Sequence, residues 1–221
     1  MLVAGTLGCA GAPPKTALIE APPTVEKVDT GASYYESEIG GMNEYAVDDQ
    51  WKRLSPRVQR CLETGTSRVE ALGGAFTVAY RVDRKGGVRW AYMKSSTLGD
   101  RATESCVLDM VRAETWPKPL SGEGLAQKTF EIEPSAAPHT LDAKRLRGLV
   151  KLAQKKTATC RKGMTGAFLA TAYLEPNGRV RAAGVAPPDE KAESAADCVV
   201  DELHKLRFSG TGKLSKVTFE I

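Results

Sequence analysis

The chain has 221 residues, of which 42% are hydrophobic and 26% are charged. This is the composition of an ordinary globular protein of one or two domains. No apolar run reaches the roughly 18 residues of a membrane-spanning helix, so no such helix is predicted. The net charge of +4 is unevenly spread, because residues 1–50 carry two lysines against eight acidic residues. An acidic leader therefore precedes a basic body.

The amino terminus, MLVAGTLGCAGAPPK, is small and apolar up to Cys9, and a stretch rich in Pro and Ala follows. It resembles the end of a bacterial lipoprotein signal, in which a small residue precedes a lipid-modified cysteine. We therefore predict a partial lipoprotein signal over residues 1–9, lipidation of Cys9, and an acidic, Pro-rich tether over 10–50. Because Ala10 rather than an acid follows the cysteine, the resemblance implies the periplasmic face of the outer membrane. The alternative is that Cys9 is an ordinary thiol.

The rest of the chain contains an internal repeat. The stretch GGAFTVAYRVDRKGGVRWA, residues 73–91, aligns without a gap with TGAFLATAYLEPNGRVRAA, residues 165–183. The same alignment places Cys106 on Cys198 and Trp116 on Phe208, and both copies close with the tetrapeptide TFEI. Identities on Gly, Cys and apolar positions indicate that one small module occurs twice.

Each repeat contains one pair of cysteines, Cys61 with Cys106 and Cys160 with Cys198. An even count, at equivalent places in both copies, predicts two disulfides in an exported protein. Each would contribute about 4 kcal/mol in the chain-entropy model, which matters for modules of this size. A zinc site is disfavoured because no CxxC motif occurs and the chain has only two histidines. We predict no metal, no cofactor and no catalytic residue.

The two repeats predict the same order of elements. An amphipathic helix comes first, and in the first copy Pro56 is expected to break or delay its start. An alternating strand, a hairpin turn with Gly86 or Gly178 at positive φ, and a return strand follow. A second helix carries the second cysteine, and a last strand ends in TFEI. The predicted fold class is α+β, with two tandem αββαβ modules over residues 51–134 and 140–221. In each, two helices cover a three-stranded antiparallel sheet.

The segment from Gly73 to Pro119 resembles the TonB carboxy-terminal domain, and more closely its cysteine-bearing variant, the AgmX/PglI C-terminal domain of myxobacterial envelope proteins. The shared features are a strand opening with Gly, a Gly-Val hairpin return, SSTLGD, a helix holding CV, and an aromatic-Pro before the last strand. Residues 142–221 match more loosely. The resemblance implies a non-enzymatic adaptor or scaffold in a motility or transport assembly.

The resemblance also implies that the last strand of each module lies at a sheet edge, where a partner peptide can add a strand. The edges are expected over Gln127–Glu133 and Ser215–Ile221, whose charged residues equally suit a protected edge. A further possibility is that the two edges pair with each other. The candidate residues for partner-strand binding are Lys128, Phe130, Ile132, Val217, Phe219 and Ile221.

The helix before Cys160 carries cations opposite its apolar stripe, which makes it a candidate for binding anionic lipid, lipopolysaccharide or an acidic partner. A plain solvated helix face is the alternative. Nucleic acid is not expected, because no aromatic residues interleave the basic run. The expected partners are envelope proteins and, through the lipid anchor, the membrane. The competing hypothesis is a soluble ligand-binding protein with no anchor. The basic face comprises Lys144, Arg145, Arg147, Lys151, Lys155 and Lys156.

Overall fold

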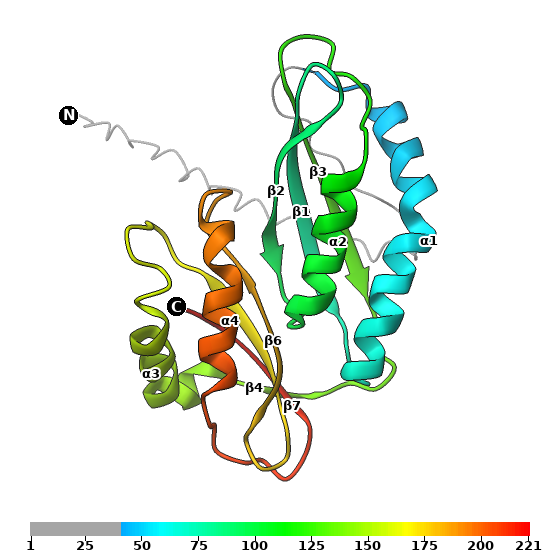
Figure 1. Ribbon diagram of the computed structural model, residues 1–221. Helices are drawn as coiled ribbons and strands as arrows, with labels where there is room; N and C mark the ends of the chain where they lie inside the picture. The colour runs from blue at the N-terminus through cyan, green and yellow to red at the C-terminus, as the bar shows by residue number, and fades with distance from the viewer. Residues whose placement is uncertain (1–40) are drawn as a thin grey trace, which may run out of the picture. The chain divides into compact units, whose positions relative to one another are not determined.

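In the computed structural model, which describes residues 41–221, the chain forms four α-helices and two β-sheets, and the predicted α+β class is confirmed (Figure 1). Residues 41–134 contain a three-stranded antiparallel sheet, and we call them the first half. Residues 135–221 contain a four-stranded mixed sheet, and we call them the second half. Cys9 lies outside the described residues, and so does the predicted tether up to residue 40.

The first half opens with α1, Glu44–Arg68, which begins inside the segment predicted as a tether. The side chain of Asn43 accepts a hydrogen bond from the Ala46 amide at 3.0 Å and caps the helix. Pro56 lies within the helix, so the expectation that it breaks or delays the start was wrong. Its ring is exposed to solvent, and water can bind the carbonyl one turn earlier that has lost its amide partner.

The first sheet has the order β2-β1-β3 and is antiparallel throughout. Helices α1 and α2 lie side by side over one face of it (Figure 1). That face supplies alternate, fully buried residues from the central strand, and Trp51 of α1 packs against the rings of Tyr80 and Phe130. The elements are β1 Gly74–Val82, β2 Val88–Ser96, α2 Arg101–Ala113 and β3 Gly124–Ile132.

The second half departs from the predicted three-stranded sheet. Its order is β4-β7-β5-β6, because residues from the linker add β4 in parallel to β7, with His139–Leu141 opposite Ser215–Val217. Helices α3 and α4 lie side by side over one face (Figure 1). The elements are β4 His139–Leu141, the 3-10 turn η1 Ala143–Leu146, α3 Arg147–Thr157, β5 Leu169–Leu174, β6 Val180–Ala186, the 3-10 turn η2 Ala192–Ala195, α4 Ala196–His204 and β7 Ser215–Glu220.

Both hairpins use the same local device. Gly86 and Gly178 adopt φ values of 95° and 82°, as predicted. The Gly86 carbonyl accepts from the Trp116 amide, and the Gly178 carbonyl accepts from the Phe208 amide, each at 2.8 Å. A Cβ atom on either glycine would collide with the carbonyl oxygen of that same aromatic residue. Each hairpin therefore docks on the loop that leads to the last strand of its sheet.

Both predicted disulfides are present. Cys61 of α1 is bonded to Cys106 of α2, with 5.8 Å between the Cα atoms. Cys160, just past the end of α3, is bonded to Cys198 of α4, with 5.7 Å between the Cα atoms. In each half the bond joins the two helices that cover the sheet, so it restrains the spacing of the helix pair over the core.

Replacing Cys61 and Cys106 together by Ser should lower the free energy of unfolding by about 4 kcal/mol, because the open chain regains its loop entropy. The pair Cys160 and Cys198 should show a similar loss. Urea unfolding without reductant measures both, and Cys9→Ser, which leaves the two bonds intact, is the control. Equal stability of either double variant and the parent protein would contradict the prediction.

Candidate functional site

The hydrophobic core of the first half extends into the second half, which also has a core cluster of its own. Tyr173, Ala182 and Ala186 of the second half belong to the core cluster of the first. As a result β5 is buried on both faces, with Ala170 and Ala172 under the helices and Thr171 and Tyr173 facing the first half. An antiparallel sheet covered by helices on one face commonly exposes the other face to solvent. In the second half, contact with the first half buries that other face along β5.

A carboxylate is buried where the halves meet. Glu104, in the first turn of α2, has no exposed surface. Its Oε1 accepts from the Ser96 hydroxyl at 2.6 Å, and its Oε2 accepts from the Val185 amide of β6 at 3.2 Å. Gly184 lies directly against this carboxylate, and a Cβ there would collide with it. Burial raises the pKa of Glu104 to about 7, although the bond from Ser96 and the charge of Arg101 oppose that rise.

A second glutamate makes the reciprocal contact. Glu193, in η2 of the second half, accepts from the Met93 amide of β2 at 3.3 Å. Met93 and Val185 coincide in the sequence alignment of the two segments, and β2 and β6 are the outermost strands of their sheets. Each strand edge thus has an amide that is bound by a carboxylate from the opposite half. These amides lack a partner strand at the sheet edge, and the carboxylates give them a hydrogen-bond acceptor at the interface.

Arg101 ties this interface together from the side of α2. Its guanidinium donates to Glu193 at 2.8 Å and to Asp197 of α4 at 2.7 Å. The side chain of Arg101 is only 11% exposed, and the negative charges of Glu193 and Asp197 outweigh its desolvation and raise its pKa further. The guanidinium itself stays charged, and through Glu193 and Asp197 it links the start of α2 to η2 and the start of α4.

A third polar contact joins the loop after α1 to the second sheet. The Gly73 amide donates to the Tyr173 hydroxyl at 3.1 Å, and the Lys216 ammonium donates to the Gly73 carbonyl at 2.5 Å. Lys216 also lies 5.2 Å from the centre of the Tyr173 ring. Burial lowers the pKa of Lys216 to about 8. Lys216, expected among the charges of a sheet edge, instead binds the first half.

The predicted partner-strand residues are divided between two different environments. β3 is the last strand of the first sheet among the described residues, and Phe130 on it stacks on Phe76. β7 is not an edge along Ser215–Val217, because β4 pairs with it there. β3 and β7 do not pair with each other. Most candidate side chains point inward, and those that are buried are Lys128, Val217, Phe219 and Ile221, while Phe130 and Ile132 are half-buried.

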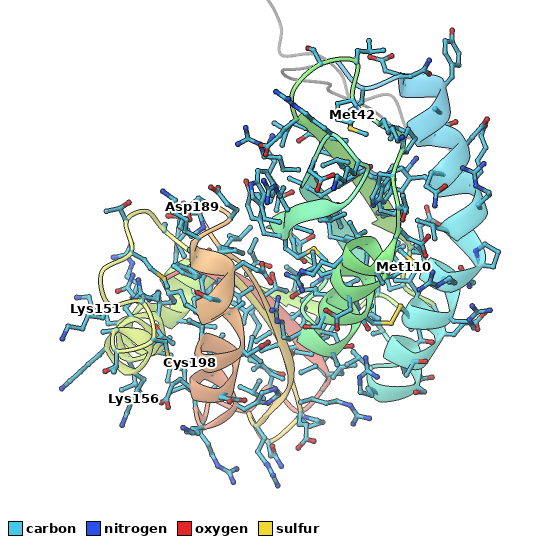
Figure 2. All side chains as sticks on the ribbon, turned by 45° about the horizontal axis from the view of Figure 1, so that its top comes forward. Met42, Met110, Lys151, Lys156, Asp189 and Cys198 are labelled. Carbon is cyan, nitrogen blue, oxygen red and sulfur yellow. A yellow bond between two sulfur atoms is a disulfide. The ribbon has the colours of Figure 1, made fainter. Side chains whose placement is uncertain are left out.

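The basic face lies where it was predicted, on η1 and α3. All six of its cations are exposed, and the apolar side of α3 packs on the core of the second half through Ala153 and Thr157. Figure 2 shows Lys151 and Lys156 pointing away from the body of the second half. Within residues 41–221, this face and the β3 edge are the two predicted binding surfaces that the fold leaves at the outside of the molecule.

Chemical centres are sparse in the described part of the chain. No three His, Cys, Asp or Glu residues between 41 and 221 are grouped to hold a metal ion. In the same range, every helix is too short or too polar to cross a bilayer. No protein-family model, curated protein or solved structure matches this chain. The TonB-like resemblance therefore stays a prediction from the residues alone.

Sequence reasoning missed Glu104, although the sequence holds a signal for it. Glu104 stands three and four residues before Val107 and Leu108, on the same face of α2 as the buried stripe. A lone acid within an apolar stripe indicates a buried partner, which is here the Val185 amide. Glu193, the other carboxylate at this interface, lies in the short turn η2 before α4.

The raised pKa of Glu104 predicts a specific pH dependence of stability. Between pH 4.5 and about 7 the folded protein keeps a proton that the unfolded chain has released. The contribution of Glu104 to stability is therefore greatest below pH 4.5, falls as the pH rises to about 7, and then levels off. From this group alone the free energy of unfolding should fall by about 3 kcal/mol across that window.

Urea unfolding of the oxidised parent protein and of Glu104→Gln from pH 4 to pH 8 tests this prediction. In Glu104→Gln the free energy of unfolding should no longer show this fall with pH. Glu63→Gln, the same change on the exposed side of α1, is the matched control and should keep the slope. Parallel stability profiles for the parent protein and Glu104→Gln would refute the assignment.

Proposed function

We propose that this chain is a non-enzymatic cell-envelope protein whose halves are duplicated TonB-C-terminal-like modules, and that it acts as an adaptor or scaffold in a multiprotein motility or transport assembly. The observation that carries the proposal is the pair of disulfides, Cys61–Cys106 and Cys160–Cys198. Each joins the two helices of its half, and Cys106 aligns with Cys198 in the repeat. Stable disulfides belong to oxidising compartments such as the periplasm.

The position of β3 supports strand addition as the mode of binding. β2 and β6 contact each other's halves through Glu193 and Glu104, and β4 covers part of β7. β3 has β1 on one side and is the last strand of its sheet among residues 41–221. A partner that adds a strand along residues 129–132 would gain main-chain hydrogen bonds.

The proposed location follows from the sequence. Lipidation of Cys9 would hold the protein at the periplasmic face of the outer membrane, with the segment up to α1 as a tether. The two halves would then search for partners close to the membrane.

Photocrosslinking in the native cell tests the adaptor role. A photoreactive amino acid at Leu125 or Glu131 of β3 should crosslink an envelope protein, because both positions lie along the strand that a partner would join. The same amino acid at Gln59, exposed on α1, is the matched control. The proposal fails if the β3 positions yield no adduct, or if Gln59 yields the same adducts with equal efficiency.

A further inference from the structure

The stretch from Ala143 to Leu174 carries only positively charged side chains. It contains eight cationic residues and no Asp or Glu, whereas the whole chain has 31 cations and 27 acids. Such a one-sided run on a folded element produces a local positive potential. The eight residues are Lys144, Arg145, Arg147, Lys151, Lys155, Lys156, Arg161 and Lys162.

The cations of the basic face do not stabilise the fold through ion pairs. Many exposed cations elsewhere are paired, for example Lys52 with Asp48, Arg112 with Asp109 and Lys205 with Glu202. None of the six cations of the basic face makes an ion pair with any residue in the described range. Like charges one turn apart, such as Lys151 and Lys155, repel each other and weaken a helix.

The first turn of α3 strengthens this argument. The helix starts at Arg147 with no acid in its first turn and no side-chain cap on Leu146. Cations at this end oppose the helix dipole, which favours negative charge there. Asp142 caps the preceding turn η1, where its side chain accepts from the Lys144 amide at 2.9 Å, and no acid follows it within the first turn of α3.

An apolar residue stands within the charged surface. Leu152 is 38% exposed, although Ala153 beside it is fully buried in the core of the second half. Its neighbours along the exposed side are Lys151, Lys155 and Lys156, at distances of one, three and four residues in sequence. Leu152 therefore exposes an apolar side chain next to the long, flexible side chains of three lysines.

We infer that the basic face of η1 and α3 docks on the surface of an anionic lipid bilayer. The long, flexible lysines that dominate it act as point charges, which suits a diffuse layer of headgroups better than a defined carboxylate pocket. Leu152 is placed to enter the boundary between headgroups and acyl chains. This contact needs neither the lipid on Cys9 nor the adaptor role, so it goes beyond the proposed function.

Vesicle cosedimentation with the full, oxidised, unacylated chain tests the inference. Binding is expected to vesicles of phosphatidylcholine mixed with phosphatidylglycerol and not to phosphatidylcholine alone, and it should weaken as salt is added. The triple variant Lys151→Gln, Lys155→Gln, Lys156→Gln should bind about a hundredfold more weakly, at about fivefold for each lysine. Glutamine keeps nearly the same helix propensity, and circular dichroism checks that the fold is unchanged.

A charge-matched control separates this face from net charge. The triple variant Arg60→Gln, Arg84→Gln, Lys85→Gln removes three exposed cations of the first half and should bind as the parent protein does. Leu152→Ala should weaken binding while leaving its salt dependence unchanged. The inference is overturned by equal binding to neutral vesicles, by equal loss in the two triple variants, or by binding to polyglutamate with none to anionic vesicles.

Discussion

The covalent bond between the two covering helices is the constraint on which each half depends. Among residues 41–221, neither sheet has more than four strands, and each buries one face under a pair of helices. Cores of this size are marginal by themselves, and a bond that closes a loop of about 40 residues removes much of the unfolded chain's freedom. Because the bonds link α1 to α2 and the end of α3 to α4, they hold the helices at the spacing that the buried side chains need.

The packing of the halves on each other solves a second problem, which is the unsatisfied edge of each sheet. β2 and β6 meet across the interface without joining into one sheet, and a glutamate from each half binds an amide of the other's outer strand. Burying a carboxyl group destabilises the fold unless the group is hydrogen-bonded, which explains the partners around Glu104. The same interface buries the second face of β5. This interface involves neither β3 nor the basic face, the two surfaces that we propose for partners.

Local sequence signals predicted most of what happens inside each half. Alternating apolar residues placed the strands, glycines marked the hairpins, and equivalent cysteines predicted the disulfides. These local signals did not predict contacts between segments that are far apart in the sequence. β4 has three residues and no periodicity of its own, and it forms because β7 offers a free edge. The inward role of Lys216 depends on where Gly73 of the other half lies.

The candidate binding surfaces divide in the same way. The basic face is a property of one helix, so its spacing alone located it, and the structure adds that Leu152 is exposed within it. The strand edges depend on sheet order, and the prediction treated both copies alike. Among residues 41–221, β3 is the outermost strand of its sheet, whereas β7 is partly covered because the linker between the halves supplies β4.

The redox state of the cysteines in the native cell tests the central claim most directly. Cells quenched with acid and alkylated without reductant would be analysed by mass spectrometry of the intact chain and its peptides. The account predicts that Cys61, Cys106, Cys160 and Cys198 carry no alkyl group and that their peptides are joined in the pairs described. Four alkylated thiols would contradict both the oxidising compartment and the adaptor role that rests on it.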